Sequence, residues 1–265
     1  MSLQVTQDFI PLGHPNRPGT KLYGIKARVW HGTANFDKGA TDIMNGNYAG
    51  RAYVKKWNTT LGKYEFFEAD GVTAFAFGVA HVYIDKDSAV IKVPLDEVTY
   101  SCGDRELPYD NGFKGQTQLA TSVFNNQQNY YTWSIELCMN DMTAWPQVLA
   151  NAIEFVRTYM PKADIEDYRH YDLTAKICPS PMVDNSPGVC PAWATFKASV
   201  KTALTTPALP IGTPLVKVNG QIINNKMDVQ PFMKDGRLFV PIRFVAEALG
   251  KTVTWISGEN MADIE

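Results

Sequence analysis

Buried strands alternate with amphipathic helices along much of this 265-residue chain, and that alternation limits the folds open to it. Tyr131–Cys138 is an apolar run of strand length, and Pro146 then suits the first turn of a helix. Apolar side chains follow at a helical period, at Val148, Ala152, Phe155, Val156 and Tyr159. A second stripe with this period comprises Trp193, Phe196, Val200 and Leu204. The pattern predicts an α/β domain whose central mixed β-sheet is flanked by helices.

Shorter segments complete the predicted domain. Strands are expected at Ile25–Trp30, Thr73–Asp85 and Ala89–Val93, with a turn at 85–88 between the last two. Short helices are expected at Ala40–Met44 and Leu119–Phe124. His31 then stands at the end of the first strand.

The composition changes after residue 204. Residues 205–214 hold three prolines in ten positions, which is typical of a linker. Asn219-Gly220 at the centre of 215–223 predicts a β-hairpin. A strand at 238–241, a helix at 242–249 ended by Gly250 and a strand at 252–256 are expected to follow. We therefore expect a main domain at 1–204, a linker at 205–214 and a small α+β module at 215–265.

Charge and hydropathy exclude several classes of partner. A net charge of −2 gives no electrostatic attraction to nucleic acid or to anionic membranes. No stretch approaches the ~18 uninterrupted apolar residues of a membrane-spanning helix. Met1–Asp8 lacks the basic and apolar segments of a secretory signal. The sequence predicts a monomer, made in the cytoplasm without insertion into a membrane.

An imidazole, an ammonium and a thiol lie within nine residues of one another at 170–178. His170 and Cys178 are both suited to Zn²⁺. An extended backbone would put Lys176 on the side of the thiol, where a cation can hold a polarised carbonyl oxygen. A third ligand must come from elsewhere, and His31 in Trp30-His31-Gly32-Thr33-Ala34 is the best candidate.

Four motifs in order resemble those of the type 2 zinc N-acetylmuramoyl-L-alanine amidases. Residues 30–34 are similar to the family's I-H-x-T-A, and 170–179 to its H-x-D-x-x-x-K-x-C-P. Between them, 80–85 resemble A-H-Y-V-V-D, and 133–138 resemble S-I-G-I-E-I-C. The resemblance covers roughly residues 20–200, and it implies the fold shared by T7-type lysozymes and peptidoglycan recognition proteins.

The resemblance also implies a site and a substrate. One zinc ion per chain would be held by His31, His170 and Cys178, with the fourth position open to water. The substrate would be bacterial peptidoglycan, cleaved between N-acetylmuramic acid and L-alanine of the stem peptide. Three more residues are expected to contact the substrate or to support the ligands: His81, Thr33 and Asp172. Asp172 has a second interpretation as the cap of a local turn.

Glu136 shares one face of its strand with Ser134 and Cys138. A carboxylate there is costly unless it pairs with a cation or takes part in the chemistry. The resemblance favours catalysis, because Bacillus-phage-type members have a catalytic Glu at this position. The T7-like branch instead has a Tyr where this chain has Ala80. Proton transfer is therefore assigned to Glu136, and stabilisation of the oxyanion to Lys176.

One position departs from the family pattern. Many members have W-H-A-G where this chain has Tyr100-Ser101-Cys102-Gly103, so the role of that His is absent or altered. The four cysteines are predicted to be free thiols in the cytoplasm: Cys102, Cys138, Cys178 and Cys190. A disulfide between Cys178 and Cys190 is disfavoured, because it would remove the metal thiolate.

The C-terminal segment carries a separate resemblance. Residues 216–220 and 237–250 are similar to the copper-amine-oxidase N-terminal-like module, which recurs on surface proteins of Gram-positive bacteria. Residues 206–265 contain no His or Cys, so no copper ligand is expected. Attachment to the cell wall is the preferred role, and a spacer is the alternative.

These expectations describe a phage or prophage endolysin that reaches the wall through a membrane hole. An exported bacterial autolysin would use the same chemistry. Two other classes stay open. One is a non-catalytic peptidoglycan-binding protein, against which the presence of Cys178 argues. The other is a structural zinc module whose fourth ligand is His81 or Cys102.

Overall fold

The computed structural model describes residues 3–102, 117–183 and 190–205, and most of 214–265 except 215, 220, 225–226, 235, 257 and 259–260. The chain divides into two compact units, Met1–Leu204 and Thr205–Glu265. Most of the predicted linker, residues 206–213, lies outside the described residues. Among the described helices, none combines the length and the apolar character needed to cross a membrane.

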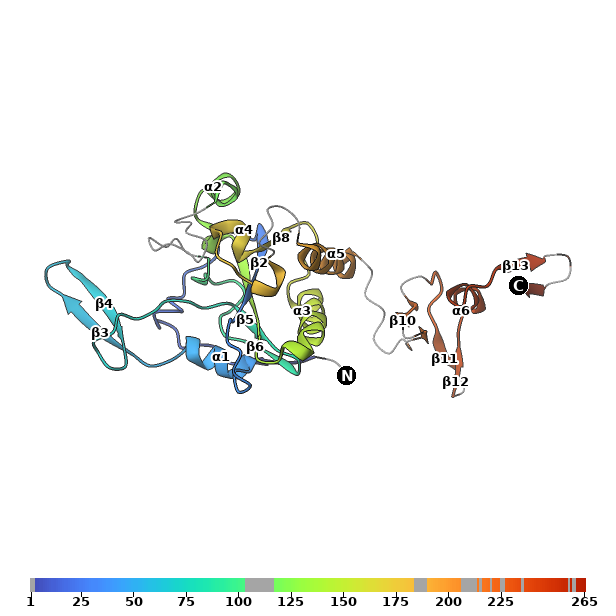
Figure 1. Cartoon of the computed structure of the whole chain (residues 1–265), viewed down its shortest axis with the longest axis horizontal. Coiled ribbons are helices and arrows are strands. Elements are labelled where there is room, and N and C mark those ends of the chain that lie inside the picture. The colour runs from blue at the N-terminus through green and yellow to red at the C-terminus, as the bar shows by residue number, and fades with distance from the viewer. Residues whose placement is uncertain are drawn as a thin grey trace. The chain divides into compact units, whose positions relative to one another are not determined.

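Six strands form one mixed sheet in the first unit, in the order β1-β6-β5-β7-β2-β8 (Figure 1). They are β1 (Gln4–Gln7), β2 (Ala27–Gly32), β5 (Val82–Ile84), β6 (Ser88–Ile91), β7 (Thr132–Leu137) and β8 (Glu166–Arg169). β5, β7, β2 and β8 run parallel, whereas β6 is antiparallel to β5. The predicted mixed central sheet is confirmed.

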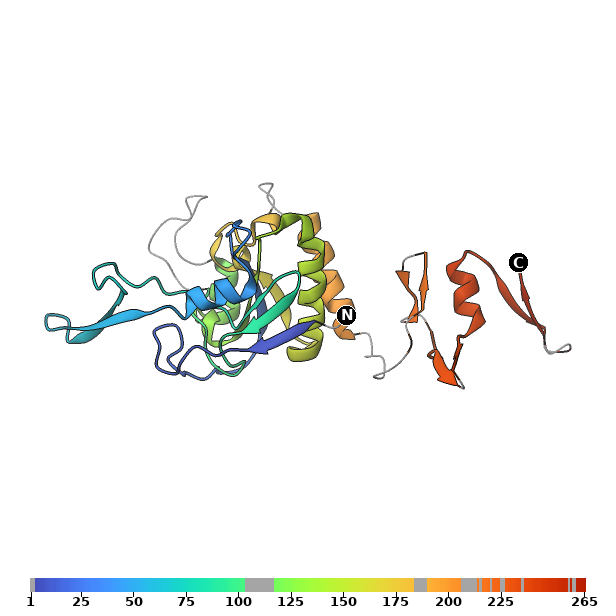
Figure 2. The same cartoon turned by 90° about the horizontal axis from the view of Figure 1, so that it is seen from below.

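Helices cover both faces of this sheet. α3 (Trp145–Tyr159) and α5 (Pro191–Thr205) lie side by side in Figures 1 and 2, and both pack on the face that carries Trp30 and Ile135. α1 (Asp42–Ala49), α2 (Gln118–Phe124) and α4 (His170–Thr174) contribute to two smaller clusters. Three short 3-10 turns complete the unit: Gln128–Tyr130, Met142–Ala144 and Ser180–Met182.

A buried ion pair sets the register between β2 and β8. Arg28 and Asp167 are opposite one another in the parallel ladder, and the guanidinium donates two bonds of 2.8 and 2.9 Å to the carboxylate. The remaining Arg28 nitrogen donates to the carbonyls of Met160 and Lys162, and the Trp30 indole donates to Asp167 at 2.8 Å. Because the donors have partners, this charge is tolerated in the core.

The predicted strand at 73–85 is much shorter in the structure. Only Val82–Ile84 joins the sheet, because the preceding residues belong to an excursion built on the hairpin of β3 (Tyr53–Asn58) and β4 (Lys63–Glu68). The Phe75 N–H donates to the Phe66 carbonyl, so this stretch pairs with the hairpin and not with the sheet. The hairpin, which the sequence analysis did not predict, projects from the body of the unit (Figures 1 and 2).

The described residues of the second unit form three two-stranded antiparallel pairs and a helix. The pairs are β9 (Lys217–Val218) with β10 (Gln221–Ile222), β11 (Phe232–Lys234) with β12 (Arg237–Phe239), and β13 (Val253–Ile256) with β14 (Met261–Ile264). α6 (Ile242–Ala248) follows β12. Asn219 has φ 50°, as the predicted hairpin turn requires.

Candidate metal centre and its cleft

Three possible metal ligands meet at the carboxyl edge of the parallel strands. His31 lies near the end of β2, His170 is the first residue of α4 directly after β8, and Cys178 follows α4. The two Nδ1 atoms are 3.1 Å apart, and the Cys178 sulfur is 3.9 Å from Nδ1 of His31. One donor atom from each residue lies within 4.8 Å of the others.

This donor set fits zinc. Ideal tetrahedral coordination separates two nitrogen ligands by about 3.3 Å and a nitrogen from a sulfur by about 3.6 Å. Burial, and then the charges of His170 and Lys176, hold the pKa of His31 well below its usual value, which favours the neutral imidazole that a metal needs. Burial raises the pKa of the Cys178 thiol to about 12, whereas the Gly32 N–H and the Lys176 charge favour the thiolate.

Two local features hold the ligands in place. Asp172 accepts the Arg169 N–H at 2.8 Å and pairs with its guanidinium at 2.6 Å, which fixes the first turn of α4 under His170. The Gly32 N–H reaches the Cys178 sulfur at 3.4 Å. A Cβ on Gly32 would lie 2.8 Å from the Met139 sulfur and 3.1 Å from Cβ of Pro179, so this close approach requires glycine.

Cys102 lies on the outer side of the His31 ring. Its sulfur is 3.4 Å from Nε2, the nitrogen that does not face the other two ligands. The Cys102 N–H donates to the side chain of Asn129, and its carbonyl accepts from the side chain of Gln128, so hydrogen bonds hold the backbone on both sides of the thiol. Since its sulfur lies at the far nitrogen of His31 and outside the ligand cluster, the use of Cys102 as a fourth ligand is not supported.

His81 does not contact the cleft. Its side chain is fully buried, its Nδ1 accepts the Ser134 N–H at 3.0 Å, and its Nε2 donates to the Glu97 carbonyl at 2.8 Å. Burial lowers the pKa of His81 to about 4. The predictions of a substrate contact and of a fourth ligand at His81 are wrong, because both ring nitrogens bond to backbone and hold β7 in place.

Glu136 enters the cleft from β7 beside the cluster. It stands opposite His31 on one side and Tyr83 on the other. Its Oε2 is shielded from solvent, and none of the residues that the structure describes forms a hydrogen bond or an ion pair with this oxygen. Burial raises the pKa of Glu136 to about 7, and the Lys176 charge opposes that shift.

The cleft has a volume of about 690 Å³. Besides the three possible ligands, Glu136 and Lys176, its lining includes Thr33, Tyr83 and Ser101. Thr33 also closes the end of the sheet, because its N–H donates to Leu137 and its hydroxyl accepts from Met139. Ser101 contacts the Cys102 sulfur at 3.5 Å.

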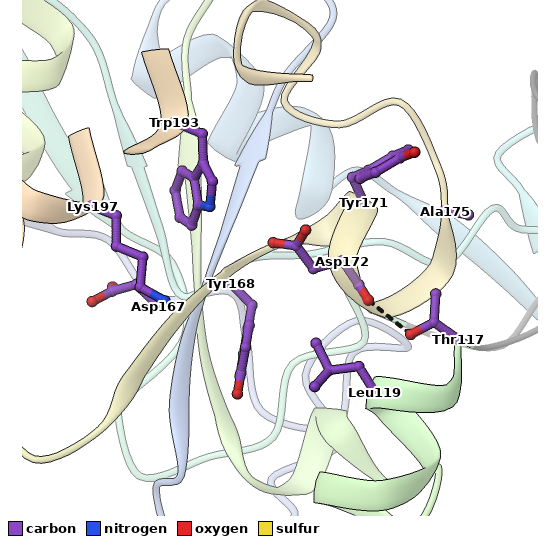
Figure 3. Close-up of a pocket in the computed structure, with 9 residues that line it drawn as sticks. All are labelled: Thr117, Leu119, Asp167, Tyr168, Tyr171, Asp172, Ala175, Trp193 and Lys197. Carbon is purple, nitrogen blue, oxygen red and sulfur yellow. Dashed lines mark hydrogen bonds between the residues drawn. The ribbon is translucent and has the colours of Figure 1, made fainter. Parts of the chain in front are cut away.

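Asp172 lines a different pocket, of about 480 Å³, that shares no residue with the cleft (Figure 3). There its carbonyl accepts the Thr117 hydroxyl at 2.7 Å, while its carboxylate is bound to Arg169. The structure therefore gives Asp172 the capping role, and a contact with substrate in the cleft is not supported.

Two residues of the site were not recognised from sequence in the positions they occupy. Tyr83 faces Glu136 from β5. The one sequence feature that could have placed it in the cleft is its position two residues after His81 in the same strand motif. The contact of Cys102 with His31 joins residues 71 positions apart, and no local pattern indicates it.

Comparison with known proteins gives consistent relatives over about three quarters of the chain. The amidase BlyA of Bacillus subtilis is 26% identical over 216 residues, which are 79% of this chain and 50% of BlyA. The amidase CwlL of Bacillus licheniformis is 26% identical over 206 residues, 76% of this chain and 48% of CwlL. The chain's homologues are N-acetylmuramoyl-L-alanine amidases. The chain spans about half the length of these amidases.

The fold of the first unit is that of an amidase catalytic domain. The solved catalytic domain of XlyA superposes with a TM-score of 0.50 at 23% identity, covering 75% of this chain and 99% of that domain. A family profile described as "Copper amine oxidase N-terminal domain" matches residues 192–264. The match begins inside α5, which packs into the first unit through Phe196 and Val200.

Proposed function

We propose that the chain hydrolyses bacterial peptidoglycan at the amide bond between N-acetylmuramic acid and L-alanine, with one zinc ion per chain. One arrangement carries the proposal: His31, His170 and Cys178 meet in the same cleft as Glu136 and Lys176. Three protein ligands leave a position for water, as in catalytic rather than structural zinc sites. The choice of bond follows the activity for which the amidase relatives are named.

The mechanism divides the chemistry among few groups. Zinc at such a site supplies a Lewis acid, which polarises a carbonyl and lowers the pKa of water towards ~7. Glu136 takes the proton of the attacking water at its unpaired Oε2, and a pKa of about 7 suits it to return that proton to the leaving amine. The Lys176 ammonium stabilises the carbonyl oxygen as negative charge develops on it.

We further propose an endolysin role, in which the enzyme lyses a host cell wall from within. This is supported by similarity to a solved structure described as a mutant endolysin from Bacillus subtilis, with a TM-score of 0.50. An autolysin would use the same residues. We also keep the proposed division at 1–204, 205–214 and 215–265, with the last part attaching the enzyme to the wall.

Loss of a ligand should remove both metal and activity. We expect His170→Ala and Cys178→Ser to bind far less than one zinc per chain and to release no N-terminal L-alanine from purified walls. Metal analysis and the wall assay measure the two effects. Cys190→Ser, at a thiol outside the cluster, is the matched control and should retain both. Full activity in a metal-free preparation would contradict the proposal.

Glu136 and Lys176 are not proposed as ligands, so their variants should keep zinc. Glu136→Gln is nearly isosteric but cannot accept a proton, and Lys176→Ala removes one donor to the oxyanion. Each is expected to lower kcat by about two to three orders of magnitude, measured on a soluble muropeptide. Lys197→Ala, which lines the pocket of Figure 3, should have no such effect. Near-normal turnover by Glu136→Gln would make Glu136 a structural carboxylate.

Cys102 should tune metal binding through the His31 ring. Because the outer nitrogen of a ligating histidine needs a fixed partner, Cys102→Ala is expected to weaken zinc binding by about tenfold or more. Cys102→Ser keeps a polar partner and should lose less. Competition with a chromophoric chelator measures the zinc dissociation constant. Cys138→Ala is the control, because it removes another buried thiol, one that contacts Asn45. Equal zinc affinities of Cys102→Ala and Cys138→Ala would refute the proposed role of Cys102.

The C-terminal unit is proposed to act only in attachment. A chain ended near Ala203 should cleave soluble muropeptides at an unchanged rate but sediment less with intact walls, because attachment raises local concentration without altering the site. If the shortened chain does not fold, the division at residue 204 is wrong. Equal sedimentation of both chains would favour the spacer alternative.

A further inference from the structure

A second, apolar hollow continues the cleft on the side of the β3–β4 hairpin. Its volume is about 390 Å³, and we call its main lining the aromatic shelf: Pro15, Pro18, Phe66, Phe77 and Tyr100. Phe77 and Tyr100 line both this hollow and the cleft. A substrate bound across Glu136 and the ligand cluster could therefore extend onto the shelf.

The shelf is held rigidly in spite of its exposure. Phe77 is 52% exposed, yet its ring makes edge contacts with Phe75 at 5.5 Å and with Phe66 at 6.1 Å between centroids. Phe75 is buried under the Arg51 guanidinium, 4.3 Å from its ring centroid. An exposed aromatic ring that is already ordered loses little conformational entropy when a ligand covers it.

An ion pair at the base of the hairpin fixes the segment that carries Phe77. Arg51 donates to Glu68 at 2.6 and 2.8 Å, and it also donates to the Ala76 carbonyl at 3.0 Å. The Ala76 N–H in turn donates to Glu68 at 3.1 Å. Hydrogen bonds on both sides of the residue before Phe77 therefore fix the backbone that carries this ring.

Among the described residues that line the hollow, none is Lys, Arg, Asp or Glu. The His14 ring, which also lines the hollow, accepts the Asn16 N–H at Nδ1 and is bonded to the Arg51 carbonyl through Nε2. A charged ligand group would lose hydration there and gain no partner. The hollow therefore suits an uncharged ligand that presents C–H surface to aromatic rings.

We propose that the aromatic shelf binds the glycan of the substrate, at the uncharged rings of its N-acetylated amino sugars, and not the stem peptide. This inference rests on the function proposed above. The stem peptide carries carboxylates and an amine, for which the shelf offers no counter-charge. Sugar rings present apolar C–H faces that stack on aromatic side chains, so Phe77 becomes a determinant of substrate length.

Two soluble substrates test the proposal: a stem peptide on a single N-acetylmuramic acid, and the same peptide on a longer glycan. The wild-type enzyme should have the higher kcat/KM for the longer one. Phe77→Ala should lower kcat/KM about fivefold to tenfold more for the longer substrate than for the short one. Trp57→Ala is the control, because Trp57 is 54% exposed on the same hairpin but lines neither hollow.

Equal losses on both substrates, a loss confined to the short substrate, or no loss would each overturn the assignment. Cleavage of neither substrate by the wild-type enzyme would instead count against the proposed function. In that case NMR titration with an N-acetylglucosamine tetrasaccharide tests the shelf directly. Binding to the wild type that Phe77→Ala abolishes would support the shelf, whereas no binding or equal binding to both would refute it.

Discussion

The buried ion pair between Arg28 and Asp167 sets the geometry on which the candidate site depends. These residues are opposite one another in the parallel ladder of β2 and β8, and His31 and His170 lie three residues further along each chain. The separation of the two imidazoles is therefore fixed by a contact in the core. Removal of either partner would leave an uncompensated buried charge, typically at a cost of about 3–5 kcal/mol.

Inside the cleft, burial and the Lys176 ammonium shift the pKa values of the two acidic groups in opposite directions. Burial raises the pKa of Glu136 and of the Cys178 thiol, and Lys176 lowers both. The same ammonium, together with burial, disfavours protonation of His31. Lys176 thus favours the ionised carboxylate and thiolate and the neutral imidazole, which are the forms that metal binding and proton transfer require.

The apolar pattern predicted the mixed sheet and located the strand that ends near His31, but it gave no strand before His170. The ligand set came from the resemblance of the motifs to the amidase family, and the structure brings these residues to one edge because parallel strands share their carboxyl ends. His81 was misassigned, since a buried histidine bonded to backbone and one facing a cleft have the same sequence pattern. The role of Cys102 and the hairpin of β3 and β4 depend on contacts between distant segments, which periodicity does not encode.

The position of that hairpin affects how a chain with this fold can diversify. The excursion departs from the central sheet after α1 and rejoins it at β5. Within it, β3 and β4 form a two-stranded sheet of their own. Its base is tied by Arg51 and Glu68, whereas Trp57, Leu61 and Tyr64 on its outer part are exposed. Insertions or substitutions in the outer part would leave the register of β2, β7 and β8 untouched. The surface beside the cleft can therefore change in sequence while the residues at the ligand cluster stay the same.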